Sequence, residues 1–275
     1  MMNRWGWLCP WLAIALAAGV LALWGLSWWT ALLAALFLVC PALILWGLYV
    51  VTRPVTAFEP EPETCGMTMN WAAPFYDVYC GAVGLGRGFR ERTLQVAAIR
   101  PGEKILDVGC GTGVLTRMAL DIAGPGGSAV GIDPASKMIR VSRETAARLG
   151  SQAEFKVAAI EALPFPDASF DGVVSSLMLH HLPPETKRQG LAEVLRVLKP
   201  GGRLVIADFA SPANPLWWLV LWPGLMMPAV AGNLRGRVPA HLREAGFTQV
   251  ETRGHRAGLI TFWSTVKPMQ EGDSS

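Results

Sequence analysis

The sequence predicts an α/β protein built on a mostly parallel, doubly wound sheet. From residue 104 onward, short apolar and β-branched segments alternate with segments of helical periodicity, as expected when each helix crosses back over a sheet. The first apolar segment also runs directly into Gly109, Gly111 and Gly113, which suits a tight turn from a strand into a helix.

Seven strands are expected. Five follow one another as parallel strands: residues 105–108, 129–132, 153–157, 172–175 and 203–207. Residues 248–253 and 259–266 are expected to close the sheet as an antiparallel hairpin. Helices are predicted for residues 75–98, 136–149 and 239–245, and no internal repeat is evident.

Residues 104–113, KILDVGCGTG, favour binding of a nucleotide-like cofactor. The glycines let the backbone approach a ligand and let a helix begin with free N–H groups. A purely structural turn also fits the GxGxG spacing. The second apolar segment ends in Asp133, whose carboxylate can accept hydrogen bonds from ribose hydroxyls or cap the helix that follows, and the two roles are compatible.

Four phrases resemble the class I S-adenosylmethionine-dependent methyltransferases: LDVGCGTG, VGIDPASKM, EALPFPDASFDGVVSSLMLHHL and EVLRVLKPGGRLVIADF. The resemblance covers residues 70–268 and is greatest to the ubiquinone/menaquinone C-methyltransferase-like group, which shares LPFPDxSFD and RVLKPGG. The same phrases occur in methyltransferases of sterols, phospholipids and small metabolites. The resemblance implies a Rossmann-like methyltransferase domain with S-adenosyl-L-methionine as its cofactor.

The glycine-loop reasoning and the resemblance together indicate a set of cofactor-binding residues. They are Asp107, Gly109, Cys110, Gly111, Thr112, Gly113, Asp133, Pro134, Met138, Ile160 and Ser175. Relatives place an acidic residue after the third strand to bind the adenine amine, whereas this chain has Ala159. Losing one charge-assisted hydrogen bond costs about 1.5 to 3 kcal/mol, so weaker cofactor binding than in relatives is expected.

Three residues are candidates for the transfer step. His180 and His181 follow the fourth strand at the mouth of the cofactor crevice, where a neutral imidazole can take a proton from the acceptor. A packed or surface histidine is the alternative at both positions. Tyr76 belongs to the Tyr-Asp pair that the quinone group shares. The sequence shows no metal-ligand constellation, and positioning of the acceptor is expected to carry most of the catalysis.

Composition indicates a membrane segment. The chain of 275 residues is 52% hydrophobic and only 16% charged, and residues 5–52 contain no charged side chain. Residues 1–53 are therefore expected to form a hairpin of two transmembrane helices. Arg4 and Arg53 flank it, which favours both ends, and hence the catalytic domain, on the cytoplasmic side of the inner membrane. A signal peptide is the alternative, and the immediate second apolar run opposes it.

The rest of the chain is expected to divide into a linker, a catalytic domain and a tail. Residues 54–69 are expected to form a polar linker, residues 70–268 the catalytic domain and residues 269–275 a tail. Within the domain, residues 211–234 form an apolar insertion with several tryptophans, expected to be a substrate lid. Arg235 and Arg237 just beyond it suit anionic head groups, so the lid is expected to face lipid, with packing on its own domain as the alternative.

The sequence thus predicts a membrane-anchored methyltransferase for a lipid-soluble acceptor, either a quinone-type ring or a phospholipid head group. Two alternatives remain: methylation of a small or volatile metabolite with the hairpin only as an anchor, and a non-catalytic S-adenosylmethionine-binding membrane protein. The net charge of +3 gives no support to a nucleic-acid partner. The five cysteines form no CxxC pair, which argues against a disulfide framework or a zinc site. The sequence does not indicate an oligomeric state.

Overall fold

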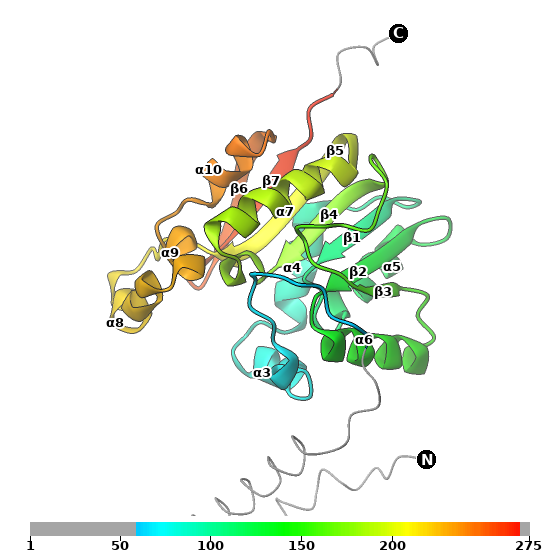
Figure 1. The fold of residues 1–275 in the computed structure, drawn as a ribbon, viewed down its shortest axis with the longest axis horizontal. Coiled ribbons are helices and arrows are strands. Elements are labelled where there is room, and N and C mark those ends of the chain that lie inside the picture. Colours follow the sequence, from blue (N-terminus) through cyan, green and yellow to red (C-terminus); the bar gives the residue numbers. More distant parts are fainter. Residues whose placement is uncertain (1–58, 270–275) are drawn as a thin grey trace, which may run out of the picture. The chain divides into compact units, whose positions relative to one another are not determined.

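The computed structural model describes residues 59–269, apart from the side chains of Leu219 and Val220 (Figure 1). The predicted hairpin over residues 1–53 lies outside these residues, as does most of the predicted tail. Within 59–269, no helix combines the length and apolar character needed to cross a bilayer.

A seven-stranded sheet forms the centre of the domain, with the strand order β3-β2-β1-β4-β5-β7-β6 (Figure 1). The strands are β1 (Lys104–Val108), β2 (Ser128–Asp133), β3 (Glu154–Val157), β4 (Phe170–Ser176), β5 (Leu198–Phe209), β6 (Thr248–Arg256) and β7 (Ile260–Val266). Strands β1 to β5 pair in parallel, whereas β7 pairs antiparallel with both β5 and β6. The predicted mostly parallel sheet with a closing antiparallel hairpin is confirmed.

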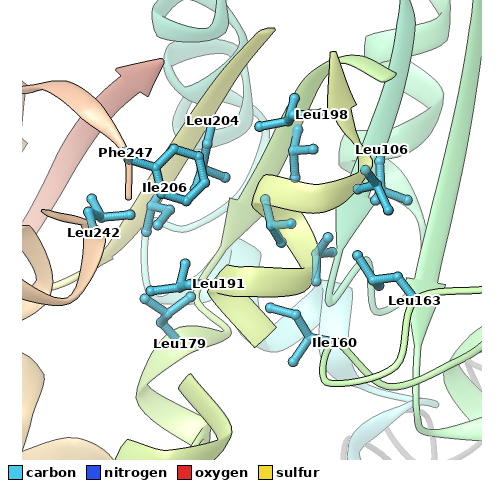
Figure 2. Packing of buried hydrophobic residues seen from close by; sticks show 14 of the residues in the cluster. Leu106, Ile160, Leu163, Leu179, Leu191, Leu198, Leu204, Ile206, Leu242 and Phe247 are labelled. Atoms are coloured by element: carbon cyan, nitrogen blue, oxygen red, sulfur yellow. The ribbon is translucent and has the colours of Figure 1, made fainter. Parts of the chain in front are cut away.

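Helices cover both faces of the sheet, and the alternation of side chains along β1 explains why. Ile105 packs in a cluster with residues of α4 (Arg87–Ala97) and α5 (Val114–Ala123). Its neighbour Leu106 points to the opposite face, into the largest cluster, which α7 (Pro184–Val197) and α10 (Val238–Glu244) cover. Figure 2 shows Leu106, Leu191 and Leu242 within this core. Successive strand residues thus anchor opposite layers.

The single helix predicted for residues 75–98 is wrong. The structure has a short 3-10 turn at Asn70–Ala72, then α3 (Tyr76–Ala82), and α4 begins only at Arg87. Gly84 between the two helices has φ of +77°, in the left-handed region where glycine is favoured, and Gly86 directly precedes α4. The break separates α3 from α4 and lets α3 lie against the glycine loop.

The apolar insertion after β5 folds into short helical turns. They are η3 (Pro215–Trp217), α8 (Trp218–Leu221), η4 (Trp222–Met226) and α9 (Pro228–Leu234). Lys187 of α7, buried with 1% exposure, donates hydrogen bonds to Ala229 O (2.7 Å) and Asn233 Oδ1 (2.8 Å) of α9. The second half of the insertion is therefore fixed to its own domain. In the first half, large apolar side chains remain exposed.

Candidate active site

A pocket lies where the carboxyl ends of β1 to β4 meet, on the side where strand order reverses between β1 and β4. It holds about 650 Å³ of empty space, open solvent included. Its walls come from the glycine loop, the ends of the strands, α3, and the segment before α3. The lining residues are Thr64, Gly66, Met67, Met69, Tyr76, Val108, Gly109, Gly111, Ile132, Asp133, Pro134, Met138, Ala158, Ala159, Ile160, Glu161, Leu177, Met178, His181 and Leu182.

The glycine loop needs glycine for different reasons at its different positions. A Cβ on Gly109 would lie 2.3 Å from Met178 Cγ, and a Cβ on Gly113 would lie 2.3 Å from Phe155 Cε1. Gly109 and Gly113 therefore permit close internal packing. A Cβ on Gly111 would meet only the ring of Tyr76, at 3.5 Å across the pocket. Gly111 is thus the glycine that keeps space open for a ligand.

Asp133 ends β2 at the pocket wall and orients the loop. Its Oδ2 accepts a hydrogen bond from Gly111 N (3.0 Å), and its Oδ1 accepts one from Ala135 N (2.9 Å) at the start of α6 (Ser136–Leu149). Burial raises the pKa of Asp133 to about 6, although these two backbone donors oppose the shift. Each carboxylate oxygen retains further acceptor capacity, so Asp133 can serve the turn and still accept a hydrogen bond from a ribose hydroxyl.

Asp107 lies beneath the loop, with 1% exposure. Thr116 Oγ1 donates a hydrogen bond to its Oδ2 (2.6 Å), whereas Oδ1 is buried and has no hydrogen-bond partner within the described part of the chain. Burial raises the pKa of Asp107 to about 7, with the Thr116 hydroxyl acting in the opposite direction. Its negative charge is therefore unfavourable in the folded chain unless a cation compensates it.

The raised pKa of Asp107 predicts a pH-dependent effect of Asp107→Asn on stability. Because the pKa of Asp107 is higher in the folded than in the unfolded state, its ionisation favours unfolding. The resulting loss of stability is absent below about pH 4 and complete above about pH 7. We expect the variant to be more stable than the native chain at pH 8, by up to about 4 kcal/mol, with little difference near pH 4.5. Urea unfolding without cofactor at the two pH values measures this, and an equal loss of stability at both would contradict it.

Helix α3 is connected to the glycine loop by a polar contact. Thr112 Oγ1 donates to Asp77 Oδ1 (2.8 Å), and the Arg90 guanidinium of α4 donates to the same oxygen (3.2 Å). The contact places Tyr76 over Gly111. Burial raises the pKa of Tyr76, so its hydroxyl remains protonated and can donate a hydrogen bond.

A smaller cavity continues beyond the main pocket and shares Tyr76, Gly109 and Leu177 with it. The side chain of Arg90 lines it and is only 12% exposed. A largely buried guanidinium beside a glycine loop suits a carboxylate, such as that of an amino-acid moiety.

The two histidines after β4 have different surroundings. His180 Nδ1 bonds Asp208 Oδ1 (2.8 Å), and its ring contacts that of Phe209. Burial alone would raise the pKa of Asp208, but the electrostatic interaction and hydrogen bonds with His180, together with the Phe209 backbone N–H, outweigh burial and lower it. His181 lines the pocket, with Nδ1 buried and, within residues 59–269, without a partner. Burial, then repulsion from His180, lowers the pKa of His181 to about 4, so it is neutral near pH 7.

The structure brings many of the expected site residues to one pocket. Those in the wall are Tyr76, Gly109, Gly111, Asp133, Pro134, Met138, Ile160 and His181. The others support the wall from behind: Asp107, Cys110, Thr112, Gly113, Ser175 and His180. Ser175 is not among the lining residues: its hydroxyl donates to Val108 O (3.0 Å) and joins β4 to β1, and its contact with the cofactor stays a prediction. Leu177 and Met178 occupy the wall in its place.

Sequence reasoning missed several residues of the site. Thr64 comes from the segment expected to be a linker, and Arg90 lines the smaller cavity. Glu161 and Asp208 were visible in the resembling phrases but lacked a role. Leu177 has φ of +54°, rare for a non-glycine residue, and such strain is frequent at binding sites.

Comparison with known proteins agrees with this geometry. A family model described as a methyltransferase domain matches residues 105–202. The chain is 40% identical over 216 residues to the ubiquinone/menaquinone biosynthesis C-methyltransferase UbiE of Ectopseudomonas mendocina, covering 70% of this chain and 82% of that protein. It is 30% identical over 241 residues to the demethylmenaquinone methyltransferase of Paenarthrobacter aurescens, covering 79% and 92% respectively.

Solved structures share the fold. A SAM-dependent methyltransferase from Aquifex aeolicus matches 65% of this chain and 89% of its own, with a TM-score of 0.53 and 21% identity. A Haemonchus contortus phosphoethanolamine N-methyltransferase 2, solved with S-adenosyl-L-methionine, matches 73% of this chain and 58% of its own, with a TM-score of 0.58 and 16% identity.

The fold and the pocket thus define a Rossmann-like methyltransferase. The chain belongs to the class I S-adenosylmethionine-dependent methyltransferases and is similar to the UbiE-type quinone C-methyltransferases. The pocket fits the cofactor, since Pro134, Met138 and Ile160 offer apolar walls to an adenine and Asp133 offers a carboxylate to a ribose.

Proposed function

We propose that the chain transfers a methyl group to a ring carbon of a lipid-soluble, quinone-type acceptor at the inner membrane, to which residues 1–53 anchor it. The observation that carries this proposal is the 40% identity to a ubiquinone/menaquinone C-methyltransferase over most of that protein's length. The catalytic domain would then face the cytoplasm, where the cofactor is made.

The environment of His181 supports methylation at a hydroxyl-bearing ring. S-adenosylmethionine supplies an electrophilic methyl group, and a ring carbon next to a hydroxyl becomes a stronger nucleophile as that hydroxyl gives up its proton. His181 is neutral, because burial lowers its pKa to about 4, and can accept the hydroxyl hydrogen bond. The methyl–carbon bond forms as the sulfur–methyl bond breaks and S-adenosylhomocysteine leaves, and the ring carbon then releases its proton to solvent, which restores the aromatic ring.

Exposed apolar side chains support access from a membrane. Trp71, Val78 and Tyr79, in the 3-10 turn before α3 and in α3 itself, are 77%, 66% and 63% exposed. In the lid, Trp222 and Met226 are 57% and 78% exposed. Helix α3 contacts the glycine loop and the lid follows β5, so both groups belong to the carboxyl edge of the sheet (Figure 1). Exposed apolar side chains at the edge of the sheet that carries the pocket favour an acceptor that reaches it from lipid.

The proposal is tested with the purified full-length chain in phospholipid vesicles. The acceptors are a demethylated quinol with a long isoprenoid tail and the same ring without a tail, and the products are identified by mass spectrometry. We expect ring methylation with kcat/KM at least about tenfold higher for the tailed quinol, because lipid concentrates it at the membrane. Methylation of vesicle head groups, or of neither quinol, would contradict the proposal.

The anchor is tested separately, because catalysis on a quinol does not require it. Membranes containing the full-length chain are washed with alkaline carbonate, which removes peripheral proteins. We expect the chain in the pellet, and its release into the supernatant would overturn the hairpin while leaving the acceptor class standing.

A further inference from the structure

The pocket contains a carboxylate oxygen that is buried without a donor. Glu161 lies two residues after Ala159, and both line the pocket. Glu161 Oε1 accepts a hydrogen bond from Thr64 Oγ1 (2.5 Å), whereas Oε2 is buried and has no partner among residues 59–269. A buried carboxylate oxygen without a donor is unfavourable. A ligand with an N–H group facing Oε2 would remove this cost.

The local hydrogen bonds fix the orientation of Glu161. Thr64 Oγ1 accepts a hydrogen bond from Gly66 N (3.0 Å), which leaves its single hydroxyl proton for Glu161. The Thr64 hydroxyl is therefore the donor, and Oε2 is left as the free acceptor. Thr64 thus determines which oxygen of Glu161 is available.

Thr64 itself is held at both sides. Glu61 accepts hydrogen bonds from Ser136 N (2.9 Å) and Ser136 Oγ (2.6 Å) at the start of α6, and Met67 N donates to His181 O (3.1 Å). The segment expected to be a polar linker is thus attached to the domain on both sides of Thr64, along the pocket wall. Such attachment lets a distant residue orient a binding group with precision.

The geometry points to Glu161 as the residue that recognises the adenine of the cofactor. Glu161 Oε2 accepts a hydrogen bond from the exocyclic 6-amino group, and Thr64 positions the carboxylate for it. Glu161 thereby takes the place of the acidic residue that Ala159 lacks. Glu161 would then give the adenine amine the acidic partner that Ala159 does not provide, whichever acceptor is methylated.

The test compares two ligands that differ at one position of the base. Isothermal titration of the full-length chain is carried out with S-adenosylhomocysteine and with S-inosylhomocysteine, in which a 6-oxo group replaces the 6-amino group. The native chain is expected to prefer the amino ligand by about 10- to 100-fold, because a carboxylate cannot donate to the oxo group.

Glu161→Gln decides the inference. Its side-chain amide can either donate to the oxo group or accept from the amino group, so we expect binding of S-adenosylhomocysteine to fall about 10- to 100-fold and the preference between the two ligands to disappear. Thr64→Val removes the hydroxyl that orients Glu161, so we expect this variant to prefer S-adenosylhomocysteine less strongly than the native chain does. Glu154→Gln removes an exposed carboxylate on β3 and is the matched control, expected to bind as the native chain does.

Two results would overturn the inference. An unchanged preference in Glu161→Gln shows that another group reads the 6-amino position. An equal loss for both ligands shows that Glu161 acts only on the structure of the pocket. The titration measures ligand binding and not methyl transfer. A chain that does not methylate the quinols could therefore still recognise adenine through Glu161, so each proposal can be contradicted without the other.

Discussion

Gly111→Arg is expected to leave the domain folded and to abolish binding of S-adenosylmethionine. A side chain at this position meets only the ring of Tyr76 and otherwise enters the pocket, so the guanidinium takes the space that the cofactor needs. The φ of +53° at Gly111 adds a folding cost of about 1 to 2 kcal/mol for a residue other than glycine. We expect kcat/KM to fall more than about 1000-fold, equivalent to ~4 kcal/mol. Calorimetric titration and urea unfolding measure the two effects.

Gly113→Ala is the matched control for this prediction. Its new Cβ would lie 2.3 Å from Phe155 Cε1 and 2.8 Å from Ser142 Cβ, inside the packed interior. Although alanine is much smaller than arginine, we therefore expect Gly113→Ala to lower the free energy of unfolding more than Gly111→Arg does. If Gly111→Arg bound the cofactor with native affinity, the loop would not be the cofactor site.

His181→Phe is expected to give the second-largest effect, a fall in kcat of about 100- to 1000-fold, because phenylalanine keeps the ring but removes the proton acceptor. The pH profile gives a separate prediction. Burial lowers the pKa of His181 to about 4, so the neutral form that accepts the proton is lost only as the pH falls through about 4. We expect no acid limb near the ordinary histidine pKa of about 6.5. Steady-state kinetics on the tailed quinol from pH 5 to 8 measures both.

His180→Asn is the control for His181→Phe. His180 does not line the pocket, and an asparagine amide can still donate a hydrogen bond toward Asp208, which limits the cost of leaving that buried carboxylate alone. We expect a smaller fall in kcat than for His181→Phe. A native kcat in His181→Phe, or a larger fall in His180→Asn, would show that His181 is not the acceptor-side base.

The strands and the glycine loop were predictable from the sequence because both are local features. The β-branched segments and the glycine spacing place β1, β2 and the loop without knowledge of any distant contact. The helix predicted for residues 75–98 failed for a reason visible in the sequence, since Gly84 and Gly86 stop it. In the lid, α9 packs on the domain and Trp222 and Met226 are exposed, and contact of the lid with lipid stays a prediction.

The parts of the site that were missed depend on distant contacts. Thr64 and Glu161 are 97 residues apart in the chain, and no sequence pattern indicates that they touch. Ser175 shows the converse difficulty, because a strand residue next to a pocket can face either the ligand or a neighbouring strand. Family resemblance indicates which positions belong to the site, and side-chain direction needs the tertiary structure.

Methylation of a lipid-soluble, quinone-type acceptor, as we propose for this chain, can be measured directly in membranes. Membranes containing the native chain, and matched membranes containing Gly111→Arg, are incubated with methyl-labelled S-adenosylmethionine and extracted with organic solvent. We expect label in the organic phase of the native sample alone, on a ring carbon of a quinone identified by mass spectrometry. Label on a phospholipid head group, or confined to the aqueous phase or the headspace, would contradict it.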